Sequence, residues 1–158
     1  EMEKILLEAN EVMLKATAEN KKGDGVARKY KFDYRADGKL DITFIRMDMK
    51  HKKLQKYAND DIIPFLNNVK GQKNIKKIYY NFADFSNVDG GEAGVGYDTS
   101  YLKSKSNGSY ERKLLVTLHE LLHTQGMGYD CVPSVKSGNG HYSQDRPGFM
   151  LGSGKKIG

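Results

Sequence analysis

The sequence predicts an α+β fold in a single domain, 1–158. Apolar residues recur at helical spacing in three segments and alternate with polar residues in three shorter ones. The 158 residues are 38% hydrophobic and 29% charged, which is typical of a globular protein. At this length roughly two-thirds of the unfolded chain's surface can be buried, so the core needs neither disulfides nor a metal. Any metal is therefore expected to serve chemistry and not folding.

The chain is predicted to begin with a helix followed by a hairpin. Residues 2–19 place apolar side chains at helical spacing, and the glycine-containing segment 21–25 ends that helix. Over 26–49, apolar residues alternate on both sides of an Asp37-Gly38 pair. That pair is a strong signal for the tight turn of a β-hairpin.

The middle of the chain is predicted to continue as helix, strand and glycine-rich stretch. Residues 51–69 return to the helical period, and Pro64 would kink that helix or begin another. Residues 74–85 alternate as a strand, and the glycine-rich stretch 86–100 follows. Within it, 93–97 could be an edge strand open to a peptide laid alongside, or a plain surface loop.

The last predicted helix covers 109–126, with Ser109 as its N-cap and Gly126 or Gly128 at its end. No regular period follows in 127–158, which is rich in glycine and polar residues. We therefore expect an N-terminal subdomain of about 1–126 and an irregular C-terminal subdomain of about 127–158.

The predicted helix 109–126 contains the sequence HELLH, with His119 and His123 four residues apart. Residues at this spacing lie on one face of a helix, so both imidazoles can reach one tetrahedral zinc. Glu120 lies about 100° further round, where its carboxylate can reach a metal-activated water instead of the metal. The apolar stripe that fixes the helix against the core is expected to be Leu114, Leu115, Leu118, Leu121 and Leu122.

The alternative interpretation is a pair of buried histidines satisfied by hydrogen bonds. The bare pattern would occur by chance in roughly one chain in a hundred of this length. The apolar opposite side of the helix, the glycine that follows it, and the downstream residues His141 and Met150 together favour zinc.

The third zinc ligand has two candidates, His141 and Asp130. We favour His141 because imidazole is the preferred ligand and nearby glycines let its loop fold back. Asp130 stays open, since glycines just before it could bend the chain back sooner. Asp145 could orient His141 through its other ring nitrogen. His51, in a lysine-rich helix start, is interpreted as an ordinary surface residue.

Four segments resemble a group of bacterial metzincin-like zinc peptidases. In order along the chain they are HELLHTQGMG, DCVPS, NGHYSQD and RPGFMLGS. They match the group's HExxHxxG helix, its short cysteine-and-proline segment, its GHxSD segment and its methionine turn. The resemblance covers about 36 residues, from Leu118 to Ser153, and is specific there.

The resemblance assigns the zinc ligands as His119, His123 and His141, and it makes Met150 an apolar floor beneath the metal. It implies a zincin-like fold, in which a mixed β-sheet carries a backing helix and an active-site helix. Three departures stand out. Tyr129 occupies the position where metzincins normally have a third ligand. In the turn, Phe149 or Gly148 replaces the aspartate before the methionine, and Leu151 replaces the tyrosine that helps hold the oxyanion in some members. Tyr142 is the nearest substitute.

The expected function is that of a zinc-dependent endopeptidase. A metal-activated water would attack the peptide carbonyl, with Glu120 as general base. Two other classes stay open: a DNA-associated zinc protease, and a non-catalytic binding module that holds zinc. An intact Glu120 argues against the module, because a structural zinc site has no use for a general base.

The expected partner is a peptide or protein substrate bound by a monomer. The net charge is +6, from 26 Lys and Arg against 20 Asp and Glu. The lysines are spread in small clusters without interleaved aromatics, so no nucleic-acid partner is expected. No apolar run is long enough to span a membrane, and Cys131 alone cannot form an internal disulfide. We expect a secreted or extracytoplasmic mature form.

Overall fold

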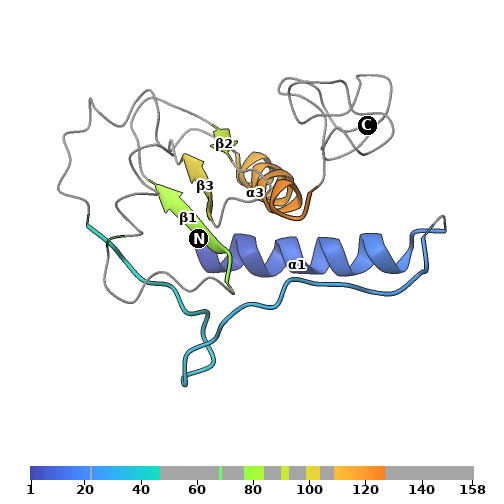
Figure 1. Ribbon diagram of the computed structural model, residues 1–158, viewed down its shortest axis with the longest axis horizontal. Coiled ribbons are helices and arrows are strands. Elements are labelled where there is room, and N and C mark those ends of the chain that lie inside the picture. Colours follow the sequence, from blue (N-terminus) through green and yellow to red (C-terminus); the bar gives the residue numbers. More distant parts are fainter. Residues whose placement is uncertain are drawn as a thin grey trace. The chain divides into compact units, whose positions relative to one another are not determined.

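The computed structural model divides the chain into two compact units, Glu1–Asp48 and Met49–Gly158 (Figure 1). The first unit holds helix α1 and an extended arm, which is the described segment 23–46. The second unit holds a sheet and helix α3. Only the backbone is described for 83, 90–92 and 99–103. The structure describes residues 1–21, 23–46, 68, 77–83, 90–92, 99–103 and 109–126.

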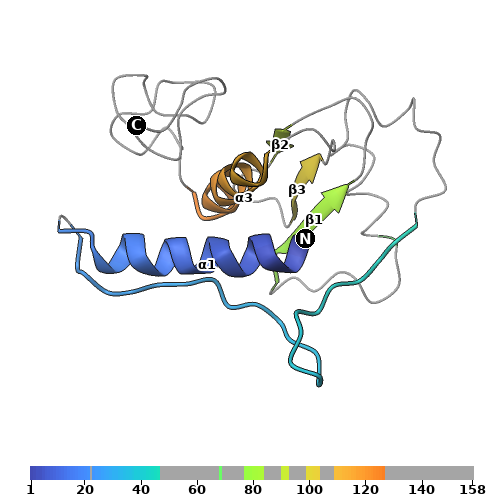
Figure 2. The same cartoon turned by 180° about the vertical axis from the view of Figure 1, so that it is seen from behind.

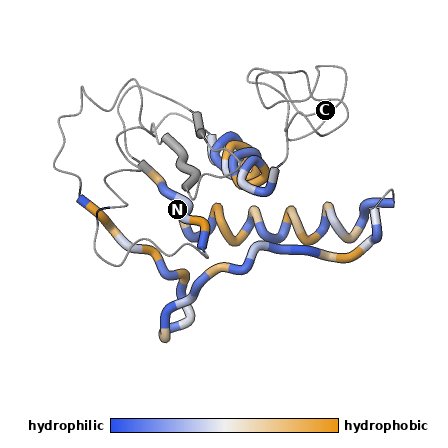
Figure 3. The backbone as a smooth tube through the Cα atoms, viewed as in Figure 1, coloured by the Kyte–Doolittle hydropathy of each residue, from blue (hydrophilic) through white to orange (hydrophobic). Residues whose placement is uncertain are grey.

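Helix α1, Met2–Ala18, confirms the helix predicted over 2–19. Its buried residues recur at helical spacing, as an amphipathic helix requires, and Figure 3 shows apolar and polar residues interleaved along it. Asn10 is buried, and both ends of its amide are paired: its Nδ2 donates to the Tyr30 carbonyl at 2.9 Å and its Oδ1 accepts from the Tyr30 N–H at 2.7 Å. The buried residues of α1 are Ile5, Leu6, Ala9 and Asn10.

The predicted hairpin is confirmed at its turn. Gly38 has φ +79°, a conformation that favours glycine, and Tyr34 and Leu40 form an antiparallel bridge across it. Beyond the bridge, the described part of 26–49 contains no regular strand. A hairpin ladder over this whole segment is therefore wrong for the residues that the structure describes.

Side chains of α1 accept hydrogen bonds from backbone N–H groups of this segment. The backbone N–H groups of Arg28, Tyr30 and Leu40 donate to side-chain oxygens of α1. Their acceptors are Thr17, Asn10 and Glu3, in that order. A backbone group bonded to a helix in this way is not available to an opposite strand.

The sheet contains three described strands: β1 (Tyr79–Ala83), β2 (Gly90–Glu92) and β3 (Thr99–Lys103). Their order is β1-β3-β2, with β1 parallel to β3 and β2 antiparallel to it, so this sheet is mixed. Strand β1 confirms the strand predicted over 74–85. The segment 93–97 lies outside the described residues.

Helix α3, Tyr110–Thr124, confirms the helix predicted over 109–126. The Ser109 hydroxyl accepts from the Arg112 N–H at 3.2 Å, and Gly126 follows the helix with φ +89°. The helix lies on the sheet against β3 and β2 (Figure 2). Leu118, Leu121 and Leu122 are buried as predicted, whereas Leu115 is 36% exposed.

The helix predicted over 51–69 lies outside the described residues except for Asn68, which is helical. Within the described part of the chain, no helix is long and apolar enough to cross a membrane. A mixed sheet carrying one helix does not show a zincin-like fold, which stays a prediction. The subdomain boundary near residue 126 also stays a prediction.

Candidate metal centre

His119 and His123 meet on one face of α3. Their Nε2 atoms are 3.0 Å apart, their ring centroids are 4.6 Å apart, and the ring planes are 87° to each other. His123 is 8% exposed and His119 is half-buried. The four-residue spacing therefore brings two imidazole nitrogens to a common point at the edge of a buried region.

This nitrogen separation is close to what a zinc ion requires. Zinc–nitrogen bonds of about 2.0–2.1 Å at a tetrahedral angle place two ligand nitrogens about 3.3 Å apart. The Nε2 atoms, at 3.0 Å, need only a small adjustment to reach that spacing. The same contact also suits a hydrogen bond between one protonated and one unprotonated Nε2 atom. The two nitrogen atoms therefore fit zinc, and they also fit a hydrogen bond between the two histidines. Measuring the zinc content of the protein separates a zinc site from a hydrogen-bonded pair.

Glu120 is buried, with 5% of its surface exposed. It shares a face of α3 with Thr117, one helical turn earlier, because residues three apart are neighbours on a helix. The Glu120 charge also acts on Tyr80 of β1: burial is the main cause that raises the pKa of the Tyr80 hydroxyl, and Glu120 raises it further. The carboxylate is thus held in a protein interior and not in bulk water.

Sequence reasoning missed Tyr80 and Thr117. The alternation of β1 did place Tyr80 with Phe82, and their rings pack edge to face with centroids 5.1 Å apart. Thr117 precedes Glu120 by three residues, which is a signal for a shared helix face. Nothing in the sequence alone shows that this face of α3 lies near the Tyr80 hydroxyl.

The predicted residues beyond α3 lie outside the described residues. Of the predicted site residues that the structure describes, His119 and His123 converge, and Glu120 lies between them in sequence on the same helix. Among the residues that it describes, no group of three or more metal-binding side chains occurs. The residues singled out in the sequence that lie outside the described ranges are His51, before α3, and, after it, Tyr129, Asp130, His141, Tyr142, Asp145 and Met150.

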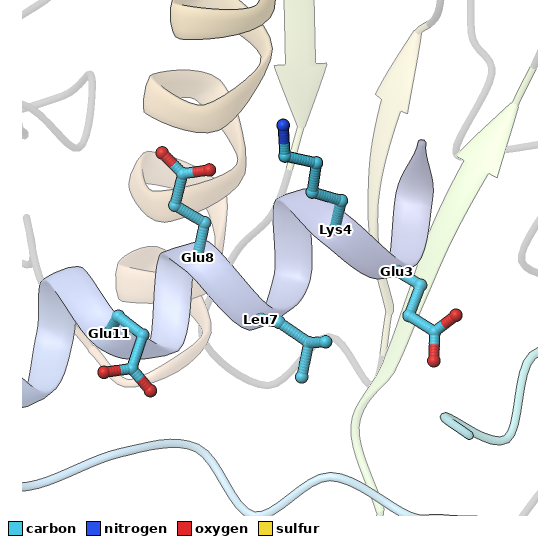
Figure 4. A pocket seen from close by; sticks show the side chains of 5 residues that line it. All are labelled: Glu3, Lys4, Leu7, Glu8 and Glu11. Atoms are coloured by element: carbon cyan, nitrogen blue, oxygen red, sulfur yellow. The ribbon is translucent and has the colours of Figure 1, made fainter.

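The first unit contains a surface hollow on α1 (Figure 4). All its lining residues belong to that single helix, and Leu7 among them is 40% exposed. A hollow lined by one helix does not provide the two walls that would grip an extended peptide. We assign no role to it. Its lining residues are Glu3, Lys4, Leu7, Glu8 and Glu11.

Comparison with known proteins finds no match to this chain among family models, curated proteins or solved structures. The case for a function therefore depends on the chain's own residues: two histidines whose nitrogens converge, and a buried glutamate between them in sequence.

Proposed function

We propose that this protein is a zinc-dependent endopeptidase. The observation that carries the proposal is the 3.0 Å separation of the His119 and His123 Nε2 atoms, next to the buried Glu120. Two convergent imidazoles supply half of a tetrahedral donor set, and catalytic zinc sites typically use three protein ligands. His141 is the proposed third ligand, and Asp130 is its alternative.

Zinc, when bound, would acidify a water molecule and polarise the peptide carbonyl. The Glu120 carboxylate would accept the proton of the attacking water and deliver it to the leaving amine nitrogen. Burial suits this role, because a base in a low-dielectric site is neither screened nor solvated by bulk water. Leu118, Leu121 and Leu122 pack α3 in place, so the histidines and Glu120 project from a rigid element.

The first experiment is elemental analysis of the purified protein. We expect about one zinc per chain, from a site with a single set of three ligands. The variants His119→Ala, His123→Ala and His141→Ala should lose it, whereas Asp130→Ala should keep it. If Asp130→Ala loses the zinc and His141→Ala keeps it, the third ligand is Asp130.

The second experiment is cleavage of a peptide library by Glu120→Gln. We expect the variant to keep its zinc and to lose about 10²- to 10⁴-fold in kcat, the range for removing a general base. Glu111→Gln is the matched control, because Glu111 is an exposed glutamate on the same helix, and it should cleave as the wild type does.

Two outcomes would contradict the proposal. A protein that binds no zinc at neutral pH, even after zinc is added back, has paired histidines and no metal centre. A protein that binds one zinc but cleaves nothing from the library is a binding module.

A further inference from the structure

Two hydroxyl groups near Glu120 are buried without a hydrogen-bond partner. Thr117 is 0% exposed, and its Oγ1 makes no hydrogen bond. The Tyr80 hydroxyl oxygen is also fully buried and makes none. Buried polar groups in folded proteins are nearly always bonded, so each exception calls for a functional or structural reason.

The other threonines in the described helices behave differently. Thr17 of α1 donates its hydroxyl to the Met13 carbonyl at 2.7 Å, and Thr124 of α3 donates to the Leu121 carbonyl at 2.6 Å. This backward bond to the preceding turn is the usual solution for a threonine within a helix. Thr117 does not use it, although it is the most buried of the three.

Both hydroxyls are close to the same carboxylate and to each other. Thr117 and Glu120 are three residues apart on α3 and therefore adjacent on its surface. Tyr80 reaches this place from β1, where its ring packs on Phe82. Burial is the main cause that raises the pKa of the Tyr80 hydroxyl; the Thr117 hydroxyl, within hydrogen-bonding reach of it, lowers that pKa, and the charge of Glu120 raises it. The three polar groups thus share one buried place between β1 and α3.

We propose that Tyr80 and Thr117 are positioning residues, whose hydroxyls donate hydrogen bonds to the Glu120 carboxylate and fix its orientation. A hydrogen bond from a hydroxyl to a charged carboxylate is stronger than one between two neutral groups, and a buried donor without a partner is costly. Small side-chain rotations that join these groups are therefore favourable. The catalytic part of this inference rests on the proposed function, since it concerns the base of that reaction.

The hydrogen bonds can be tested by stability alone. Tyr80→Phe and Thr117→Val each remove one hydroxyl and keep the shape of the side chain. If the hydroxyls bond to Glu120, each change should raise the unfolding equilibrium constant about tenfold, the effect of losing a bond to a charged group. In a Glu120→Leu background the same changes should have no effect or lower that constant, because the acceptor is gone.

The sign of the effect decides between the two states of the hydroxyls. If they are simply unpaired, Tyr80→Phe and Thr117→Val stabilise the protein in both backgrounds, because removing an unsatisfied buried polar group is favourable. That result would overturn the inference. An equal loss of stability in both backgrounds would overturn it too, because the two hydroxyls would then bond to each other and not to Glu120. Urea unfolding of the full chain supplies all the constants, and it requires neither zinc nor a substrate.

The catalytic consequence is read from steady-state kinetics. Tyr80→Phe should lower kcat by about tenfold or more, since a misplaced catalytic group reacts slowly, while KM and zinc content stay unchanged. Tyr79→Phe is the matched control: it removes the same hydroxyl from the neighbouring residue, which faces the other side of the sheet, and it should keep the wild-type kcat. An unchanged kcat in Tyr80→Phe would refute the positioning role.

A wrong peptidase assignment and a wrong assignment of the hydrogen bonds to Glu120 would give different results. If the wild type cleaves no peptide but the stability pattern holds, the proposed function is wrong and the hydrogen bonds to Glu120 stand. If the wild type cleaves peptides but Tyr80→Phe is stabilising and fully active, the peptidase stands and Tyr80 has no part in it.

Discussion

Helices α1 and α3 are similar in length and amphipathic character, yet they bury polar groups in opposite ways. Helix α1 buries one polar residue, Asn10, and both ends of its amide are paired with the Tyr30 backbone. Helix α3 buries three polar side chains within seven residues: Thr117, Glu120 and His123. The Thr117 hydroxyl has no partner.

The difference separates a structural polar group from a functional one. An amide that satisfies a neighbouring backbone stabilises the fold and specifies how the chain runs past the helix. A carboxylate, an imidazole and an unpaired hydroxyl on one short stretch cost stability, and proteins tolerate such clusters mainly at sites that do chemistry. The buried polar side chain of α1 has hydrogen-bond partners at both ends of its amide, whereas in the second half of α3 the buried Thr117 hydroxyl has none.

The largest stability effect is expected from Asn10. Asn10→Ala would leave the part-buried N–H and carbonyl of Tyr30 without their partners, at a cost of about 1–3 kcal/mol in the free energy of unfolding. Glu11→Ala, an exposed change on the same helix, should stay within about 0.5 kcal/mol of the wild type. Urea unfolding measures both. Equal effects from the two changes would mean that the amide is not structural, and the contrast with α3 would be lost.

A smaller effect is expected at the helix starts. Ser109→Ala removes the side-chain cap of α3 and should cost about 1 kcal/mol. Residue Glu1, at the corresponding position of α1, makes no cap hydrogen bond with its side chain, so Glu1→Ala should change the free energy of unfolding much less. Thermal unfolding of the two variants would sharpen the comparison. A larger loss from Glu1→Ala would reverse it.

The smallest effect at neutral pH is expected from Tyr30. Burial raises the pKa of Tyr30 to about 12, from an ordinary value of 10.0. Because the folded state holds this proton more tightly, its contribution to stability is complete below about pH 10 and is lost as the pH rises towards 12. Tyr30→Phe should therefore be as stable as the wild type or slightly more stable at pH near 7, because the Tyr30 hydroxyl is buried without a hydrogen-bond partner, and it should lose less stability under alkaline conditions.

The control for this pH dependence is Tyr34→Phe, since Tyr34 is 55% exposed. Its unfolding free energy should follow that of the wild type across the alkaline range. If Tyr30→Phe loses as much stability as Tyr34→Phe above pH 10, the Tyr30 hydroxyl is not protected by the fold.

The helices and the turn were predictable because their signals are local. The period of α1, the Ser109 cap and the Gly126 end of α3, and the Asp37-Gly38 turn each depend on residues a few positions apart. The hairpin ladder failed because α1 side chains compete for the backbone of the arm, which no local pattern reports.

Strands β2 and β3 were not predicted because pairing defines them. Strand β2 is Gly-Gly-Glu, which has little strand propensity of its own, and it exists as a partner of β3. The Tyr80 and Thr117 pair was missed for the same reason: it joins residues 37 positions apart in the sequence. The HELLH spacing did predict that the two imidazole nitrogens converge, and the third ligand stays a prediction.

The strand order β1-β3-β2 has a consequence for how the protein is made. The central strand, β3, is the last of the three to be synthesised, so within this sheet neither β1 nor β2 has a partner until Lys103 has been added. Synthesis proceeds at about 5–20 residues per second, so β1 waits roughly 1–4 s for its partner. During that time its backbone N–H and C=O groups are open to wrong pairing. Strand β2, which is Gly-Gly-Glu, has little strand propensity to offer such a pairing.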